Sequence, residues 1–174
     1  MENTERGLLL NFTGEGKGKT SAAFGTAVRA LGWGWRIAIL QFIKDEATPT
    51  GEALFFRQHF PEVIFERYGA GMLESDADHR GAAERGWARA QELLREFPGE
   101  LLILDELNVV LHFYLLEPEE IAAALLARRP GLNVVVTGRY IHKAIREISD
   151  LVSVIDTPTH PFQKGFPARR GLDF

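Results

Sequence analysis

The fold of this chain is decided by the stretch Thr13-Gly14-Glu15-Gly16-Lys17-Gly18-Lys19-Thr20-Ser21. An apolar run at residues 8–12 precedes it and Ala22-Ala23-Phe24 follows it, which is the order strand, glycine-rich loop, helix. Glycine has no Cβ, so the backbone N–H groups of such a loop are free to surround a phosphate chain. The N-terminus of the following helix adds the positive end of its dipole to an anion site. The stretch therefore predicts a phosphate-binding loop, against the alternative of a plain turn that links a strand to a helix.

The loop is a variant of the nucleotide-binding pattern G-x-x-x-x-G-K-[ST]. Gly18-Lys19-Thr20 satisfies the end of the pattern, whereas Thr13 occupies the position of its first glycine. In that pattern the Lys19 ammonium reaches phosphate oxygens and the Thr20 hydroxyl is a ligand for Mg²⁺. We therefore expect a nucleoside triphosphate site of the P-loop type, with Mg²⁺ as a cofactor.

Composition and charge narrow the class of protein. The 174 residues are 45% apolar and 25% charged, which favours one folded domain. The net charge of −4 argues against a strongly basic nucleic-acid-binding surface. The chain has no cysteine, which excludes disulfides and cysteine-ligated zinc or iron–sulfur sites. Residues 1–6 are polar and unlike a signal peptide, and no apolar run approaches the ~20 residues of a membrane helix. We expect a cytoplasmic enzyme with no nucleic-acid partner and no membrane partner.

Strand and helix patterns alternate along the chain. Strands are expected at residues 8–12, 36–42, 63–65, 101–104, 133–137 and 152–156. Helices are expected at residues 19–31, 52–59, 78–97, 118–129 and 141–148. In the longest helix, the buried stripe consists of Ala83, Trp87, Ala90, Leu94 and Phe97. This alternation predicts an α/β fold with three layers, a P-loop NTPase-like (RecA-like) architecture with a mostly parallel central sheet. We expect a single domain over residues 1–174, with a C-terminal tail at about 157–174.

A second informative stretch is Leu101-Leu102-Ile103-Leu104-Asp105-Glu106. Four apolar residues form a buried strand, and the two carboxylates follow at its C-terminal end, where open parallel sheets bind ligands. The pair predicts a site that organises Mg²⁺ beside the P-loop. The alternative is that the acidic residues only cap the next helix.

Acidic residues and a histidine also gather at Asp76, Asp78 and His79. The five histidines of the chain lack the spacing of a metal site. Acidic side chains at the start of a helix favour its N-terminus. We interpret the group as a helix N-cap rather than as a metal cluster.

Taken together, these stretches resemble the P-loop type of ATP:corrinoid adenosyltransferases, the cob(I)alamin adenosyltransferases. The resemblance covers residues 7–174, and the threonine at position 13 belongs to it. Its further matching motifs are Ala22-Ala23-Phe24-Gly25, Gln41-Phe42-Ile43-Lys44, Leu104-Asp105-Glu106-Leu107-Asn108, Thr137-Gly138-Arg139, His160-Pro161-Phe162 and Gly171-Leu172-Asp173-Phe174. The loop is specific by itself, and the other motifs gain their weight from their shared order.

The resemblance implies transfer of the 5′-deoxyadenosyl group of ATP to the cobalt of a reduced corrinoid, with release of triphosphate, in adenosylcobalamin biosynthesis or salvage. In that family Co(I) attacks the ribose C5′, and ATP lies in the loop in the reverse of the usual sense. Such a reaction needs a site that neutralises the triphosphate leaving group, and it needs no general base. The resemblance also implies a homodimer and a flavoprotein reductant that supplies Co(I).

Roles for individual residues follow from the resemblance. The residues that would bind ATP are Thr13, Gly14, Glu15, Gly16, Lys17, Gly18, Lys19, Thr20, Ser21 and Arg139. The catalytic residues would be Lys19, Thr20 and Glu106. Of these, Thr20 and Glu106 would hold Mg²⁺, with Asp105 beside them. Arg139 has an alternative role as one half of a surface salt bridge.

The chain departs from the family in the loop that contacts the corrinoid. Family members have Gly-Phe-Thr-Trp there, whereas this chain has Gly71-Met72-Leu73-Glu74, so both aromatic residues are lost. We expect Gly71, Met72 and Glu74 at the corrin, with Met72 able to fill part of the apolar space. Phe162 in the tail is a candidate to replace a lost aromatic residue. Its alternative role is to anchor the tail against the sheet.

Two other functions compete with adenosyl transfer. A P-loop phosphotransferase or ATPase would release ADP rather than triphosphate. A non-catalytic nucleotide- or corrinoid-binding protein would bind its ligand without turnover, a hypothesis that rests on the changed loop at Met72 and Glu74.

Overall fold

The computed structural model describes residues 6–71 and 77–173, and a six-stranded parallel sheet forms its centre. The strands are β1 (Leu9–Thr13), β2 (Ile37–Phe42), β3 (Ile64–Tyr68), β4 (Leu101–Asp105), β5 (Asn133–Thr137) and β6 (Leu151–Val154). Their order across the sheet is β3-β2-β4-β5-β1-β6, and each neighbouring pair is parallel. The P-loop strand β1 and the acidic strand β4 therefore lie on either side of β5, and their C-terminal ends share one edge of the sheet.

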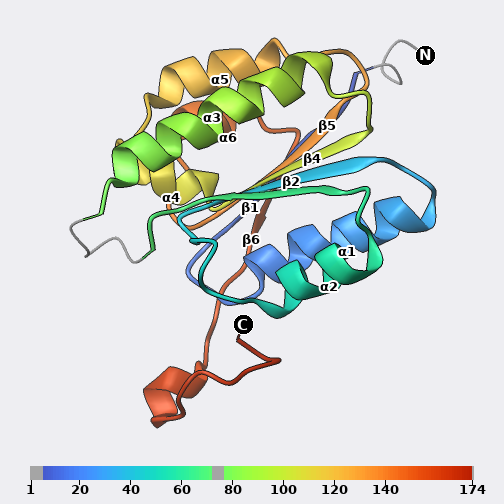
Figure 1. Ribbon diagram of the computed structural model, residues 1–174. Helices are drawn as coiled ribbons and strands as arrows, with labels where there is room; N and C mark the ends of the chain where they lie inside the picture. The colour runs from blue at the N-terminus through green and yellow to red at the C-terminus, as the bar shows by residue number, and fades with distance from the viewer. Residues whose placement is uncertain (1–5, 72–76, 174) are drawn as a thin grey trace.

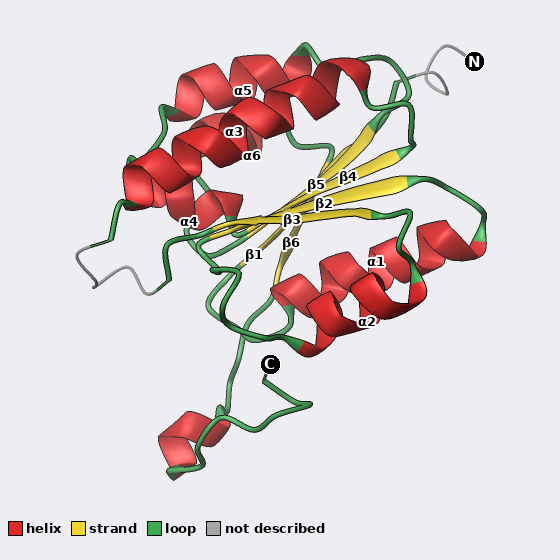
Figure 2. Ribbon diagram, viewed as in Figure 1, coloured by secondary structure: helices red, strands yellow, loops and turns green. Residues whose placement is uncertain are grey.

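Helices cover both faces of the sheet, which confirms the three-layer α/β architecture (Figure 1, Figure 2). One face carries α1 (Lys19–Gly32) and α2 (Gly51–His59). The other face carries α3 (His79–Glu96), α4 (Leu107–His112), α5 (Pro118–Leu126) and α6 (Lys143–Ile148). Strand β2 is buried at all six positions, as a strand covered on both faces must be. Within the described parts of the chain, no helix combines the length and the apolar character that a membrane crossing requires.

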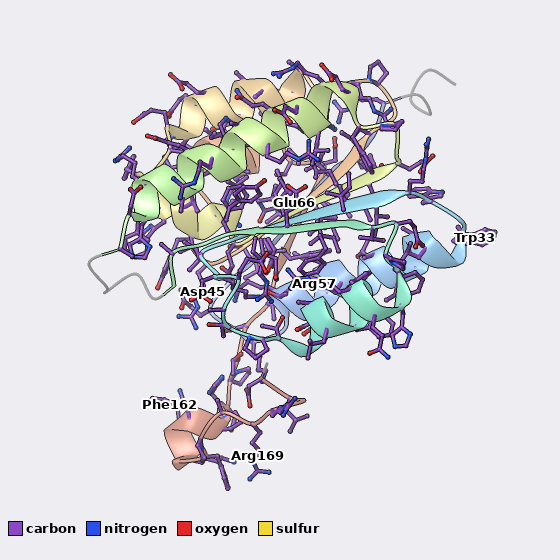
Figure 3. All side chains as sticks on the ribbon, in the orientation of Figure 1. Trp33, Asp45, Arg57, Glu66, Phe162 and Arg169 are labelled. Carbon is purple, nitrogen blue, oxygen red and sulfur yellow. The ribbon has the colours of Figure 1, made fainter. Side chains whose placement is uncertain are left out.

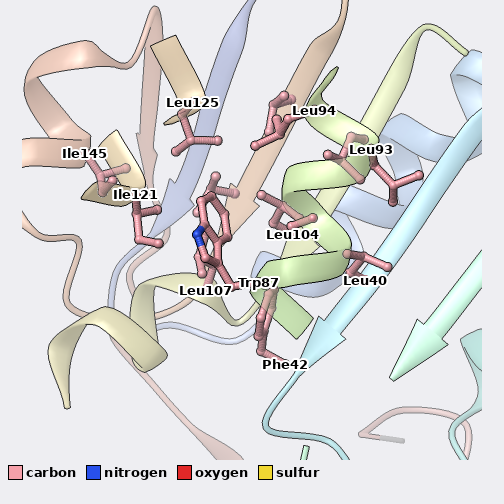
Figure 4. Close-up of a cluster of buried hydrophobic side chains, with 14 of the residues drawn as sticks. Leu40, Phe42, Trp87, Leu93, Leu94, Leu104, Leu107, Ile121, Leu125 and Ile145 are labelled. Carbon is pink, nitrogen blue, oxygen red and sulfur yellow. The ribbon is translucent and has the colours of Figure 1, made fainter. Parts of the chain in front are cut away.

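Two apolar cores hold the layers together, one on each face of the sheet. The larger core includes Trp87 of α3, Leu104 of β4 and Ile121 of α5 (Figure 4). The stripe predicted for the longest helix is confirmed, because each of its five residues is at most 8% exposed. In the smaller core, the rings of Phe24 and Phe56 join α1 to α2 with their centroids 5.4 Å apart. Each large apolar side chain buried in this way contributes ~1.5–3 kcal/mol, so the two cores fix the helices that carry the site.

Helix starts follow local sequence rules. Thr50 Oγ1 accepts a hydrogen bond from the Ala53 N–H at the start of α2, and the Asp78 side chain accepts one from the Gly81 N–H at the start of α3. The interpretation as an N-cap is thus confirmed for Asp78, whereas Asp76 lies outside the described residues. Pro118 lies in the first turn of α5, where a backbone N–H would have no hydrogen-bond partner within the helix, so proline is tolerated there. Helix α4, which the sequence pattern does not predict, begins directly after the acidic pair.

The C-terminal tail leaves the sheet after β6 and carries a short 3₁₀ helix, η1 (Pro161–Lys164) (Figure 1). Beyond η1 the chain turns back toward the P-loop. There the Lys17 ammonium forms an ion pair with the Asp173 carboxylate. This contact ties the end of the tail to the glycine-rich loop, 156 residues earlier in the chain.

Candidate functional site

A cleft of about 900 Å³ lies at the C-terminal edge of the sheet. Ligands of open parallel sheets bind at this edge, and a cleft of this size suits a small-molecule ligand. Its wall is formed by the P-loop, helix α1, the segments that follow β2, β4 and β5, and the C-terminal tail. The lining residues include Lys19, Thr20, Ser21, Lys44, Thr48, Thr50, Glu106, Val109, Arg139, His160 and Leu172.

The first glycines of the P-loop pack so closely against the chain after β6 that a larger residue would not fit there. A Cβ on Gly14 would lie 2.3 Å from the Ile155 carbonyl oxygen, and a Cβ on Gly16 would lie 2.7 Å from the Asp156 carbonyl oxygen. The Gly16 N–H donates to the Ile155 carbonyl oxygen at 2.8 Å, so the loop is held against the end of β6. Gly18, the residue before α1, has a φ of 116°, which favours glycine. The order strand, glycine-rich loop, helix is confirmed.

Lys19 begins α1 and is only 8% exposed. Its ammonium donates a hydrogen bond to the Gly16 carbonyl oxygen at 2.5 Å, which directs it back over the loop. Burial lowers the pKa of Lys19, and the nearby Glu106 carboxylate offsets part of that effect. Because burial disfavours the ammonium charge, an anion bound in the loop would stabilise Lys19.

The Asp105 carboxylate is fully buried and accepts four hydrogen bonds. Its Oδ1 accepts from the Thr20 hydroxyl at 2.9 Å and from the Thr137 hydroxyl at 2.7 Å. Its Oδ2 accepts from the Gln41 amide at 2.8 Å and from the Lys44 ammonium at 3.2 Å. A carboxylate offers about four acceptor positions, so these donors occupy its capacity. Asp105 therefore fixes the position of Thr20 at the start of α1.

Glu106, the next residue, is arranged differently. It has a φ of 65°, and its backbone N–H donates to Thr137 Oγ1 at 2.9 Å. It is the residue before α4, yet its side chain makes no capping hydrogen bond and lines the cleft instead. Burial raises the pKa of the Glu106 carboxyl, and the Asp105 carboxylate raises it further. The alternative in which this side chain only caps a helix is not observed.

Arg139 follows Gly138 at the end of β5 and lines the cleft. Its guanidinium also forms an ion pair with the Glu15 carboxylate of the P-loop, at 3.6 Å. Both side chains are more than half exposed, so this pair contributes little to stability. Arg139 therefore forms the surface ion pair of the alternative role and also lines the cleft, and its contact with ATP stays a prediction.

A family model described as ATP:corrinoid adenosyltransferase BtuR/CobO/CobP matches residues 5–174. The chain belongs to the ATP:corrinoid adenosyltransferase family. The P-loop, the acidic pair and the motifs of the tail all lie within the matched region, and the resemblance seen in the sequence is confirmed.

Relatives in the adenosyltransferase family are similar over nearly the whole chain. A corrinoid adenosyltransferase of Pseudomonas aeruginosa is 39% identical over 173 residues, which are 98% of this chain and 85% of that protein. The corrinoid adenosyltransferase of Escherichia coli K12 is 37% identical, and the corrinoid adenosyltransferase CobA of Salmonella typhimurium is 36% identical. Each of these two matches covers 98% of this chain and 87% of the relative.

The solved structure of the KaiC-like protein PH0186 from Pyrococcus horikoshii is similar in fold. It has a TM-score of 0.57 at 16% identity, and the match covers 90% of this chain and 75% of that chain. At this identity the likeness concerns the fold alone, and it agrees with the RecA-like architecture.

Most of the predicted ATP-binding residues of this adenosyltransferase lie together. Thr13 is 3% exposed at the end of β1, and Glu15 pairs with Arg139. The P-loop residues that line the cleft are Gly16, Lys17, Gly18, Lys19, Thr20 and Ser21.

One wall of the cleft was not predicted from the sequence. The segment after β2 brings Lys44, Thr48 and Thr50 into the lining, and the tail brings His160 and Leu172. Lys44, His160 and Leu172 belong to motifs of the family resemblance, which was the available signal, although the sequence assigned them no role. Thr48 and Thr50 carried no signal, because they stand in a stretch that reads as an ordinary loop.

The predicted corrinoid contacts are placed only in part. The Gly71 N–H donates to the Ile43 carbonyl oxygen at 3.2 Å, so this residue lies beside the segment that borders the cleft. Met72 and Glu74 lie outside the described residues. Phe162 is 80% exposed on the projecting tail, so it does not anchor the tail against the sheet (Figure 3).

Proposed function

We propose that this protein transfers the 5′-deoxyadenosyl group of ATP to the Co(I) of a reduced corrinoid and releases triphosphate, in adenosylcobalamin biosynthesis or salvage. One observation carries the proposal: a single cleft brings together Lys19, Thr20 and Glu106, with Thr20 held by the buried Asp105. Membership of the family supports it, as do relatives that are named corrinoid adenosyltransferases.

The reaction is a nucleophilic substitution at the ribose C5′. The electron pair of Co(I) forms the Co–C5′ bond, and the C5′–O5′ bond breaks with its electrons moving to the triphosphate. Cobalt changes from Co(I) to Co(III), and no proton is transferred in this step. The protein must therefore stabilise negative charge on the leaving group rather than supply a base.

Cationic side chains at the cleft suit that task. Lys17, Lys19, Lys44 and Arg139 all line it. Lys19 is the most constrained of them, because it is buried and its pKa is lowered by that burial. In the proposed reaction, the negative charge that develops on the triphosphate stabilises the positive charge of the buried Lys19 ammonium. Such preorganised positive charge stabilises the transition state by a few kcal/mol.

Thr20 and Glu106 would hold Mg²⁺, since a hydroxyl and a carboxylate are the oxygen ligands that this cation prefers. Within the described residues no group of three or more acidic or histidine side chains suits a metal ion. Mg²⁺ commonly binds one or two protein ligands and completes its coordination with phosphates and water. Bound there, the metal would neutralise charge on the leaving triphosphate. Asp105 would hold Thr20 in position for the metal, because it accepts a hydrogen bond from the Thr20 hydroxyl.

The corrinoid would contact Gly71, Met72, Glu74 and Phe162. The hydrogen bond from the Gly71 N–H to the Ile43 carbonyl oxygen supports this proposal, because Ile43 lines the cleft. A homodimer, a flavoprotein electron donor and a cytoplasmic location belong to the same proposal.

The test is to incubate the protein with ATP, Mg²⁺ and chemically reduced cobalamin. A light-sensitive Co–C absorption spectrum with stoichiometric triphosphate is the expected result. ADP in place of triphosphate would assign the chain to the phosphotransferases or ATPases. Binding of ATP with neither product would identify a non-catalytic protein.

A further inference from the structure

A row of buried polar side chains crosses the C-terminal edge of the sheet. Arg67 of β3 is the register partner of Gln41 of β2, and Gln41 is the register partner of Asp105 of β4. The three residues are 8%, 0% and 0% exposed. The Arg67 Nε–H donates to Gln41 Oε1 at 2.9 Å, and Gln41 Nε2 donates to Asp105 Oδ2 at 2.8 Å. Because its oxygen is engaged by Arg67, the Gln41 amide must present its NH₂ group to Asp105.

The other nitrogens of Arg67 hold the segment after β2, which is one wall of the cleft. Nη1 donates to the carbonyl oxygens of Asp45 and Thr48, at 3.0 and 2.5 Å, and Nη2 donates to Thr50 Oγ1 at 2.5 Å. Thr48 and Thr50 line the cleft. A guanidinium carries five N–H donors in a rigid plane, so a single side chain can satisfy all these acceptors at fixed angles.

Arg67 therefore touches two parts of the site at once. Through Gln41 and Asp105 it reaches the Thr20 hydroxyl, and through its Nη atoms it holds the segment that carries Thr48 and Thr50. Arg67 itself does not line the cleft. Its position across the sheet is set by the strand register, which places β3 and β2 side by side.

We propose that Arg67 is a positioning residue for ATP, which fixes the wall at Thr48 and Thr50 and the orientation of Gln41 toward Asp105. The proposal rests on the assignment of the cleft to ATP. Lysine cannot replace it, because a single ammonium cannot reach four acceptors that surround a plane. A side chain without donors would leave Gln41 Oε1 free to turn, and Asp105 would lose a fixed donor.

The test compares Arg67→Met and Arg67→Lys with wild type and with Arg89→Met as the matched control. Arg89 of α3 bonds to Glu66, the residue next to Arg67 in β3; its side chain is 32% exposed, and it is not among the residues that line the cleft. Isothermal titration with MgATP gives the dissociation constant without turnover. Steady-state assays then give separate KM values for ATP and cobalamin.

We expect the dissociation constant for MgATP to rise about tenfold or more in Arg67→Met, with a smaller rise in Arg67→Lys, since two sides of the site lose a fixed contact. The KM for cobalamin and all parameters of Arg89→Met should stay within about twofold of wild type. Unchanged MgATP affinity in the Arg67 variants would overturn the proposal, and so would failure of both variants to fold, because Arg67 would then be a structural residue. A wild type that binds MgATP without adenosylating cobalamin would refute the proposed function and leave this comparison of affinities intact.

Discussion

Replacement of Thr137 by valine tests the hydrogen-bond network behind the acidic pair. The Thr137 hydroxyl donates to Asp105 Oδ1 at 2.7 Å and accepts the Glu106 N–H at 2.9 Å. Valine has nearly the same shape, so the change removes both hydrogen bonds and leaves the volume almost unchanged. Thr137 is fully buried, so water cannot replace the hydroxyl without entering the core.

The expected magnitude follows from those two contacts. A hydrogen bond to a charged carboxylate contributes ~1.5–3 kcal/mol, and a buried N–H left without a partner costs ~1–3 kcal/mol. The lower ends of the two ranges give about 2.5 kcal/mol, and we expect the free energy of unfolding to fall by about 3 kcal/mol. That is a large part of the stability of an ordinary domain, which is ~5–15 kcal/mol.

Urea unfolding measures this change through the midpoint at constant slope. Thr26→Val is the matched control, because among the described residues the Thr26 hydroxyl donates only to the Ala22 carbonyl oxygen within α1, and its loss leaves none of them as an unpaired charge. We expect the control to change stability by about 0.5 kcal/mol or less. If Thr137→Val loses no more stability than Thr26→Val, the account of Asp105 as a buried acceptor of four hydrogen bonds is refuted.

Further predictions concern charge at the site and on the sheet. Lys19→Ala should fold normally by circular dichroism and lose most adenosyl transfer, at a cost of ~2–4 kcal/mol in transition-state stabilisation; near wild-type turnover would contradict its role at the phosphates. Glu106→Gln should shift the Mg²⁺ titration of activity to higher concentration, since an amide is an uncharged ligand; an unchanged curve would show that Glu106 does not hold the metal. Burial and the hydrogen bond to Glu66 raise the pKa of Tyr68 to about 12 from 10.0, so the unfolded chain loses this proton first and stability falls as pH rises from 10 to 12. Tyr68→Phe should remove that part of the fall in urea unfolding, and an identical pH profile would contradict it.

The elements that sequence patterns predict best are those with a long or strongly periodic apolar signal. The stripe through Trp87 runs along most of α3, which has 18 residues, and the strand 101–104 is a continuous apolar run before two charges. Both appear as expected because burial on one or both faces dictates their composition. Helix α4 was missed for the opposite reason. It has only six residues, and two of them are valine, which has a weak preference for helix. Helix α4 is stabilised by burial of Leu107, Val110 and Leu111. A sequence window of six residues does not reveal such packing.

The order of strand, glycine-rich loop and helix was predicted correctly because its sequence signal is local. The strand, the glycines, Lys19 and Thr20 are all contributed by one continuous segment, so spacing alone carries the information. The wall at Thr48 and Thr50 is different, because its shape depends on Arg67 in another strand. Only the pairing of β2 with β3 brings them together, and the register of a sheet is not readable from either strand alone.

Asp105 and Glu106 show how neighbours in sequence acquire separate roles. Side chains alternate between faces along a strand, but these two residues differ chiefly in the hydrogen-bond donors that surround them. Asp105 ends β4 between β2 and β5, so Gln41 and Thr137 reach it from either side and Thr20 and Lys44 complete its acceptor capacity. Glu106 turns out of the strand with a positive φ, and among the described residues none donates a hydrogen bond to its carboxylate. An oxygen that already accepts two hydrogen bonds has little capacity left for a cation, whereas an oxygen without donors has all of it. The sheet therefore divides the acidic pair into one residue that fixes Thr20 and one that faces the cleft, and this division supports Glu106 over Asp105 as the direct ligand of Mg²⁺.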